Sequence, residues 1–161
     1  MFWPRTAAYV AFTGIIALEM VAGSFWDLMH IEYVRVVFAR LGYPLFLLDI
    51  LGAWKLPCAV VLLAPQLPRL KEWAYAGAVF VYSGAAASHF LAGEAMSHWA
   101  GPAVFALVTL ASWALRPAAR RLDQRSAAPA PSGREWLFSG AALAVMIVIA
   151  ALSVPKGPPP N

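Results

Sequence analysis

Five long apolar segments, separated by short polar or basic stretches, constrain the fold of this chain more than any other feature. They lie at 7–26, 44–64, 72–91, 99–115 and 136–154. A helix needs about 20 mostly apolar residues to cross the hydrocarbon core of a bilayer. Of the 161 residues, 61% are hydrophobic and 12% are charged, and a soluble domain of this size could not bury so much apolar surface. The sequence therefore predicts an all-α, polytopic membrane protein, with a four-helix bundle followed by a fifth, C-terminal transmembrane helix.

The predicted organisation follows from these segments and from the basic residues between them. Most Arg and Lys residues lie near the N-terminus, at 65–71 and after residue 115, so the positive-inside rule predicts a cytoplasmic N-terminus. We expect a multi-pass protein of the cell membrane, or of the inner membrane in a source with two membranes. The expected parts are a four-helix membrane domain at 1–117, a basic Ala/Pro-rich cytoplasmic linker at 118–134, the fifth transmembrane helix at 135–154 and a disordered tail at 155–161.

Charge and cysteine content exclude several function classes. The net charge is +4, but the basic residues are spread between the apolar segments instead of forming one patch, so we expect no nucleic-acid partner. The single cysteine, Cys58, cannot form an internal disulfide, and C-x-x-C chemistry is absent. No P-loop, dinucleotide fingerprint, H-E-x-x-H or G-x-S-x-G motif occurs, and we predict no metal site.

The stretch at 27–41 mixes apolar and charged residues. Its apolar residues recur at Leu28, Ile31, Val34, Phe38 and Leu41, a spacing that is typical of an amphipathic helix. One interpretation is a helix that lies at the membrane interface as a lid. The other is a tethering loop whose polar residues face water.

Three ionisable side chains interrupt the apolar segments: Glu19 in the first, and Asp49 and Lys55 in the second. A charge at membrane depth is costly, so it usually has a partner and faces a protein interior or a wet cavity. With the predicted orientation, these three residues and His89 of the third segment all lie in the outer half of the membrane. We therefore predict Glu19, Asp49, Lys55 and His89 as catalytic residues that exchange protons with a ligand or stabilise its charge.

The predicted substrate-binding residues are aromatic or imidazole side chains. Each shares a helix face with one of the catalytic candidates, stands beside one in the sequence, or lies at the mouth of the same half of the membrane. They are Trp26, His30, Trp54, Tyr75, Tyr82 and His98.

A structural explanation stays open for the same residues. Lys55 could form an ion pair with Glu19 that only fixes the packing of two helices. Asp49 and Lys55 lie about 120° apart around their helix, so they cannot pair directly but could line two walls of one cavity. His89, near a helix end, could simply bond a neighbouring carbonyl.

Four stretches carry a resemblance to a known family. They read LGYP at 41–44, ILGAWKL at 50–56, LAPQLPRLKEWAYAG at 63–77 and GAAASH at 84–89. Both these sequence motifs and the intervals between them resemble the DoxX-like family of small four-helix membrane proteins, over about residues 7–116. The positions that match the family's characteristic residues are Gly42, Pro44, Gly52, Lys55, Pro65, Pro68, Glu72, Trp73, Gly77 and His89.

The resemblance implies a redox context. The founding DoxX and DoxD proteins are associated with quinone-linked oxidoreductase complexes, and other members are linked to redox homeostasis. The cysteines of the thiol-redox membrane relatives are missing here, which argues against disulfide exchange. The resemblance implies no particular catalytic residue.

The expected function is the binding of a lipophilic small molecule or quinone in a cavity in the outer half of the membrane, as a membrane oxidoreductase or one of its subunits. Lys55 would stabilise a developing oxyanion, and Glu19 or Asp49 would move protons. One alternative is a cofactor-free intramembrane isomerase, cyclase or hydrolytic enzyme that uses the same groups. Another is a non-catalytic scaffold subunit. A quinone is the possible cofactor, whereas haem has no supporting motif. The expected partners are the lipid bilayer and either a second copy of the chain or a membrane partner subunit.

Overall fold

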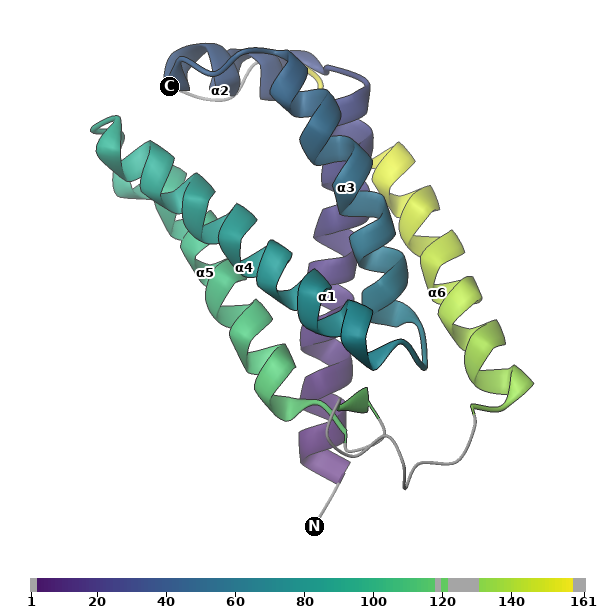
Figure 1. Cartoon of the computed structure of the whole chain (residues 1–161). Coiled ribbons are helices and arrows are strands. Elements are labelled where there is room, and N and C mark those ends of the chain that lie inside the picture. The colour runs from purple at the N-terminus through teal and green to yellow at the C-terminus, as the bar shows by residue number, and fades with distance from the viewer. Residues whose placement is uncertain (1–2, 118–119, 122–130, 158–161) are drawn as a thin grey trace.

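The computed structural model describes residues 3–117, 120–121 and 131–157, which contain helices and no strand (Figure 1). The predicted all-α class is therefore confirmed. Much of the predicted linker, at 118–119 and 122–130, and most of the predicted tail, at 158–161, lie outside the described residues. The helices are α1 (Trp3–Leu28), α2 (Glu32–Leu41), α3 (Phe46–Leu63), α4 (Pro68–Leu91), α5 (Met96–Leu115) and α6 (Gly133–Leu152).

Four helices in the described part of the chain, α1, α3, α5 and α6, are long and apolar enough to cross a membrane. The protein is therefore a multi-pass membrane protein. α4, which covers the predicted span at 72–91, is not among the four. Residues 68–72 at its start include Arg69, Lys71 and Glu72, and its second half is rich in Ala, Gly and Ser. A total of five spans and a cytoplasmic N-terminus stay predictions.

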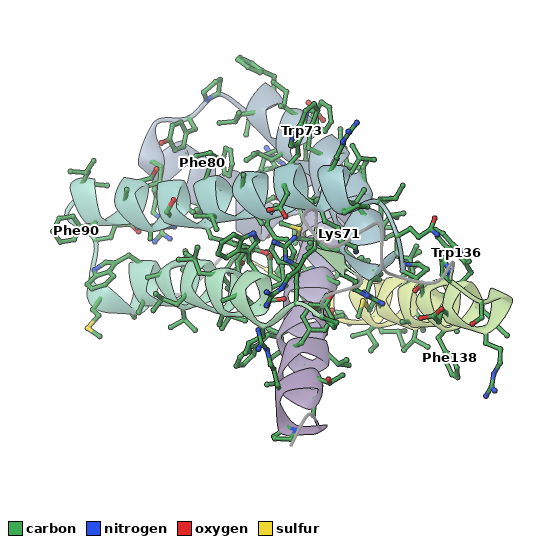
Figure 2. All side chains as sticks on the ribbon, turned by 60° about the horizontal axis from the view of Figure 1, so that its bottom comes forward. Lys71, Trp73, Phe80, Phe90, Trp136 and Phe138 are labelled. Atoms are coloured by element: carbon green, nitrogen blue, oxygen red, sulfur yellow. The ribbon has the colours of Figure 1, made fainter. Side chains whose placement is uncertain are left out.

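Large apolar side chains cover the outside of the helices (Figure 2). On α4, Trp73 and Phe80 are 77% and 74% exposed, and on α6 Phe138 is 69% exposed. An apolar surface of this kind is unfavourable in water and fits contact with lipid acyl chains. The outer side of α4 thus carries exposed apolar side chains, although α4 is not among the four candidate spans.

α1 lies at the centre of the bundle. It packs closely along α3 and also contacts α5 and α6, while α4 packs along α5. α1 and α3 approach so closely that a Cβ on Gly52 would lie 2.7 Å from Cγ of Leu28. Across this contact the Ser24 hydroxyl donates a 2.8 Å hydrogen bond to the Gly52 carbonyl. The bundle therefore consists of two closely packed pairs, α1 with α3 and α4 with α5, with a looser contact between α3 and α4.

α2 lies across one end of the bundle, which we name the α2 end (Figure 1). Gly42 ends this helix in the left-handed conformation, with φ 75°, and the N–H groups of Gly42 and Tyr43 donate to the carbonyls of Ala39 and Phe38. The helical interpretation of the stretch at 27–41 is thus confirmed from Glu32 onward, whereas residues 27–28 belong to α1. The opposite end carries the start of α1 and the turn between α3 and α4.

α6 begins two residues before the predicted start at 135. Ser132 caps the helix, because its backbone N–H donates a 2.8 Å hydrogen bond to the Glu135 carboxylate in a capping box. Residues 133–134, the last two of the predicted linker, are therefore helical. α6 packs against α1 and α3.

Candidate functional site

A cavity of about 460 Å³ lies beneath α2, and we name it the polar cavity. Five helices line it: α1, α2, α3, α4 and α5. Its polar or charged lining residues are Glu19, Trp26, Asp27, Tyr33, Arg40, Lys55, Tyr82, His89, Ser97 and His98. Its volume falls within the range of roughly 300–1,000 Å³ that small-molecule sites occupy.

An ion pair between Lys55 of α3 and Asp27 of α1 lies in the polar cavity. The Lys55 Nζ is 2.8 Å from Oδ2 of Asp27, and the two side chains are 14% and 5% exposed. Asp27 reaches this position because α1 continues to Leu28 instead of ending at Trp26. A buried ion pair contributes little net stability compared with well-packed apolar residues, so its presence is not explained by packing alone.

Glu19 faces the same ion pair across Gly23. A Cβ on Gly23 would lie 2.7 Å from the Lys55 Nζ and 3.1 Å from Oε1 of Glu19. Only a residue without a side chain leaves room there for the lysine and the carboxylate together. The hydroxyl of Tyr82 on α4 donates a short hydrogen bond to Glu19, and the Tyr82 ring stacks on Phe105 of α5 at 5.3 Å between ring centroids.

A second group of polar side chains joins the α2 end of α4 to the turn before α5. His89 Nδ1 lies 2.5 Å from the Glu94 carboxylate, and the ring of His98 stacks on that of His89 with centroids 6.2 Å apart. Arg40 of α2 lies 3.7 Å from the same carboxylate, so α2 is linked to this turn. The hydrogen bond from His89 holds the pKa of the Glu94 carboxyl below its ordinary value of 4.5.

The indole N–H of Trp26 is buried at the polar cavity and has no hydrogen-bond partner among the described residues. Its ring contacts Tyr33 edge-on, with centroids 6.4 Å apart. A buried donor without a partner costs about 1–3 kcal/mol. A ligand with an acceptor oxygen in the cavity would remove that cost.

The structure brings six of the ten predicted site residues to the polar cavity. They are Glu19, Trp26, Lys55, Tyr82, His89 and His98. The shared helix face of Tyr82 and His89 is thus observed, since both are buried on α4. Lys55, however, pairs with Asp27 and not with Glu19.

The other four predicted residues lie elsewhere. Asp49 is 57% exposed at its side chain and pairs with His30 at 2.9 Å outside the cavity, so it does not line a wall opposite Lys55. Trp54 points outward from α3 and is 72% exposed. Tyr75 shares the face of Tyr82 but lies about 10 Å further along α4, where its hydroxyl contacts Ser112 at 2.9 Å.

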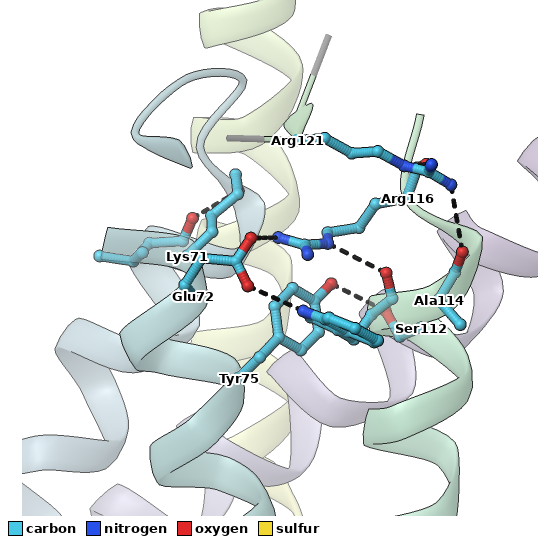
Figure 3. Close-up of polar contacts among 9 residues, drawn as sticks. Lys71, Glu72, Tyr75, Ser112, Ala114, Arg116 and Arg121 are labelled. Carbon is cyan, nitrogen blue, oxygen red and sulfur yellow. Dashed lines mark hydrogen bonds and ion pairs between the residues drawn. The ribbon is translucent and has the colours of Figure 1, made fainter. Parts of the chain in front are cut away.

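Tyr75 belongs to a polar network at the opposite end of the bundle (Figure 3). Arg116 forms a 2.8 Å ion pair with Glu72 and stacks over the Tyr75 ring at 5.1 Å. The Lys71 Nζ donates to the carbonyls of Val61 and Leu62, which end α3. These charges have partners within the protein and fix the helix ends there, so we assign this network a structural role.

Sequence reasoning missed Asp27, Tyr33, Arg40 and Glu94. Asp27 follows Glu19 and Gly23 at intervals of four, so the same helix face would have revealed it had the first helix been extended by one residue. Arg40 and Glu94 come from different helix ends, and spacing along one helix cannot predict their contact. In the described ranges no group of three or more His, Cys, Asp and Glu side chains is placed to hold a metal ion.

Comparison with known proteins gives one match. The model of the DoxX-like family matches residues 11–112, which include α2, α3, α4, most of α5 and the part of α1 from residue 11 onward. Searches of curated proteins and of solved structures found no significant match.

Proposed function

The chain belongs to the DoxX-like family, and from that premise we propose that the polar cavity binds a lipophilic molecule with carbonyl or hydroxyl oxygens, of the quinone type, and exchanges protons with it. The observation that carries this proposal is the Lys55–Asp27 ion pair, with Glu19 beside it, in a cavity inside a membrane bundle. Its place in the cell is the membrane, since the protein is multi-pass.

The donors at the polar cavity suit a ligand with two oxygens. Lys55 has three N–H donors and uses one toward Asp27. Trp26 offers a second donor that has no partner among the described residues. A buried cation such as Lys55 stabilises negative charge on a ligand oxygen more strongly than it would in water.

Proton transfer falls to Glu19 in this proposal. Its carboxylate accepts a hydrogen bond from Tyr82 and lies next to the Lys55 ammonium group. A protonated Glu19 can give its proton to a ligand oxygen that Lys55 holds, and Tyr82 can keep the carboxylate oriented during the transfer. A quinone, when bound, supplies the electron chemistry. As a subunit of a membrane oxidoreductase, this chain would bind and orient the ring while electrons come from a partner.

A second candidate function is cofactor-free acid–base catalysis on a lipophilic substrate. The Tyr82–Glu19 hydrogen bond favours it, because an acid, a base and the Lys55 cation together suffice for an isomerisation, cyclisation or hydrolysis. A non-catalytic scaffold role predicts instead that neutralising these charges changes assembly or stability and has no effect on ligand binding.

Binding of a tail-less, fully substituted benzoquinone to the purified protein in lipid nanodiscs tests the proposal. Quenching of tryptophan fluorescence is suitable, because Trp26 lines the cavity. We expect saturable binding that weakens at least tenfold in the double variant Lys55→Gln/Asp27→Asn. The matched control is Asp49→Asn, since Asp49 lies outside the cavity. Equal affinity in all three proteins, or no saturable binding, would refute the proposal. A quinone in an organic extract of the purified protein would support it further.

A further inference from the structure

A second hollow of about 460 Å³, which we name the lipid groove, lies between α3 and α4. Its lining is almost entirely apolar, and Lys55 is the only charged residue among the described residues that form it. Two exposed tryptophans, Trp54 and Trp73, stand along it, 72% and 77% exposed. In Figure 1, α3 and α4 diverge from the turn that joins them toward the α2 end.

The lipid groove and the polar cavity meet at Lys55. Lys55 and Val81 line both hollows. The Lys55 ammonium group is held by Asp27 on the polar side, and its four-carbon stem can cover apolar surface on the groove side. From this junction the groove runs toward the opposite end of the bundle, past Val61 on α3 and Leu70 on α4.

The walls of the groove leave space for a guest. A Cβ on Gly77 would meet no atom within 4 Å, so the middle of the α4 wall is open. Pro57 on the α3 wall lacks a backbone N–H. Along α3 the groove extends about 9 Å from Lys55 to Val61, and along α4 about 16 Å from Val81 to Leu70.

We propose that the lipid groove holds the apolar tail of the molecule whose oxygen-bearing head occupies the polar cavity, and that this molecule enters sideways from the bilayer. The inference rests on the proposed function of the polar cavity and narrows the ligand to a single-tailed amphiphile. A polar cavity and an apolar groove that adjoin at Lys55 match a molecule with an oxygen-bearing head and one apolar chain.

The test compares two quinone probes and two glycine variants in nanodiscs of fixed lipid composition. The probes share one fully substituted benzoquinone head, and one of them carries a ten-carbon chain. Gly77→Phe places a ring in the groove. Gly84→Phe is the matched control, because Gly84 lies on the same helix, lines neither hollow and also has open space at its Cβ. Gly77→Leu is a smaller second variant, for use if Gly77→Phe does not fold.

We expect Gly77→Phe to weaken binding of the tailed probe at least tenfold and to change binding of the tail-less probe less than twofold, while Gly84→Phe changes neither. The proposal is overturned if the two variants affect the tailed probe equally, since the effect would then not depend on a substitution in the groove. If the tail-less probe shows no saturable binding to the unsubstituted protein, the function proposed for the polar cavity fails as well. If the tail-less probe binds saturably but Gly77→Phe does not weaken binding of the tailed probe, only the proposal for the groove is overturned.

Alkylation of Cys58 gives an independent measurement. Cys58 lines the groove and is the only cysteine of the chain. The tailed probe should slow its reaction with N-ethylmaleimide several-fold, whereas the tail-less probe should leave the rate unchanged. Equal rates with both probes would contradict the proposal.

Discussion

Removing the two members of the Lys55–Asp27 pair separately and together distinguishes a functional charge cluster from a structural one. Both side chains are at least 86% buried. Removing one partner of a buried ion pair costs about 3–5 kcal/mol, because the remaining charge stays buried without compensation. Replacing both partners with apolar residues of similar size is often neutral or stabilising.

The geometry also predicts an order for the two single variants. In Asp27→Leu the Lys55 ammonium group keeps Glu19 as a neighbour across Gly23, so we expect a loss near the lower limit, about 3 kcal/mol. In Lys55→Met the carboxylates of Asp27 and Glu19 both lose their cation, so we expect a loss near about 5 kcal/mol. In the double variant only Glu19 remains buried without a cation, so we expect a loss of about 3 kcal/mol, smaller than that of Lys55→Met, and no binding of the quinone head.

Reversible unfolding in mixed micelles of increasing SDS content, followed by tryptophan fluorescence, measures these free energies. Asp49→Leu is the control, because Asp49 is mostly exposed and its pair with His30 should be worth at most about 1 kcal/mol. Losses below about 1 kcal/mol in both single variants would show that the cluster is hydrated and that the reasoning from burial is wrong. A folded double variant that still binds quinone would remove the cluster from the proposed function.

Two further predictions follow from individual contacts, and a third concerns the oligomeric state. Gly23→Ala should weaken quinone binding at least fivefold because its Cβ would displace the Lys55 ammonium group, whereas Gly14→Ala, with open space on the same helix, should have no effect on the affinity. The pKa of Glu94 is lowered by the hydrogen bond from His89, so the stability this pair contributes is complete above the ordinary value of 4.5 and is lost as the pH falls through the lower folded value. Melting temperatures should therefore decline less steeply with falling pH in Glu94→Gln than in the unsubstituted protein. We also expect a homodimer or a bound membrane partner, and native mass spectrometry of the protein from nanodiscs should show a species heavier than one chain. A single-chain mass at every protein concentration would contradict this.

The sequence was most informative where spacing along one helix decides the outcome. Seven-residue intervals placed Tyr82 and His89 on the buried face of α4. The apolar period at 28–41 indicated a helix, with a loop as the alternative, and the structure has α2 there. Glu19 and Lys55 stood out because charges inside apolar segments need a reason. Each of these inferences required only the geometry of an isolated helix.

The sequence was least informative about contacts between helices. His30 and Asp49 pair with each other at the surface, although each had been assigned to the site from its own helix. Tyr75 lies on the predicted face of α4, but too far along the helix to reach the polar cavity. Residues that share a helix face can still lie at different depths. Asp27 was missed because the predicted end of the first helix, at Trp26, is two residues before the end of α1 at Leu28, and helix boundaries are less certain in a sequence than helix identity.

The division of the bundle into two closely packed pairs has a mechanical consequence. The Ser24–Gly52 contact joins α1 and α3 so tightly that they would move as one rigid body, and α4 and α5 would move as another. A hinge rotation of one pair against the other, about the contact of α1 with α5, would disturb mainly the small contact between α3 and α4. It would move α3 away from α4. Side chains at the contact of α3 and α4 would then become more accessible, while those between α1 and α3 stay covered.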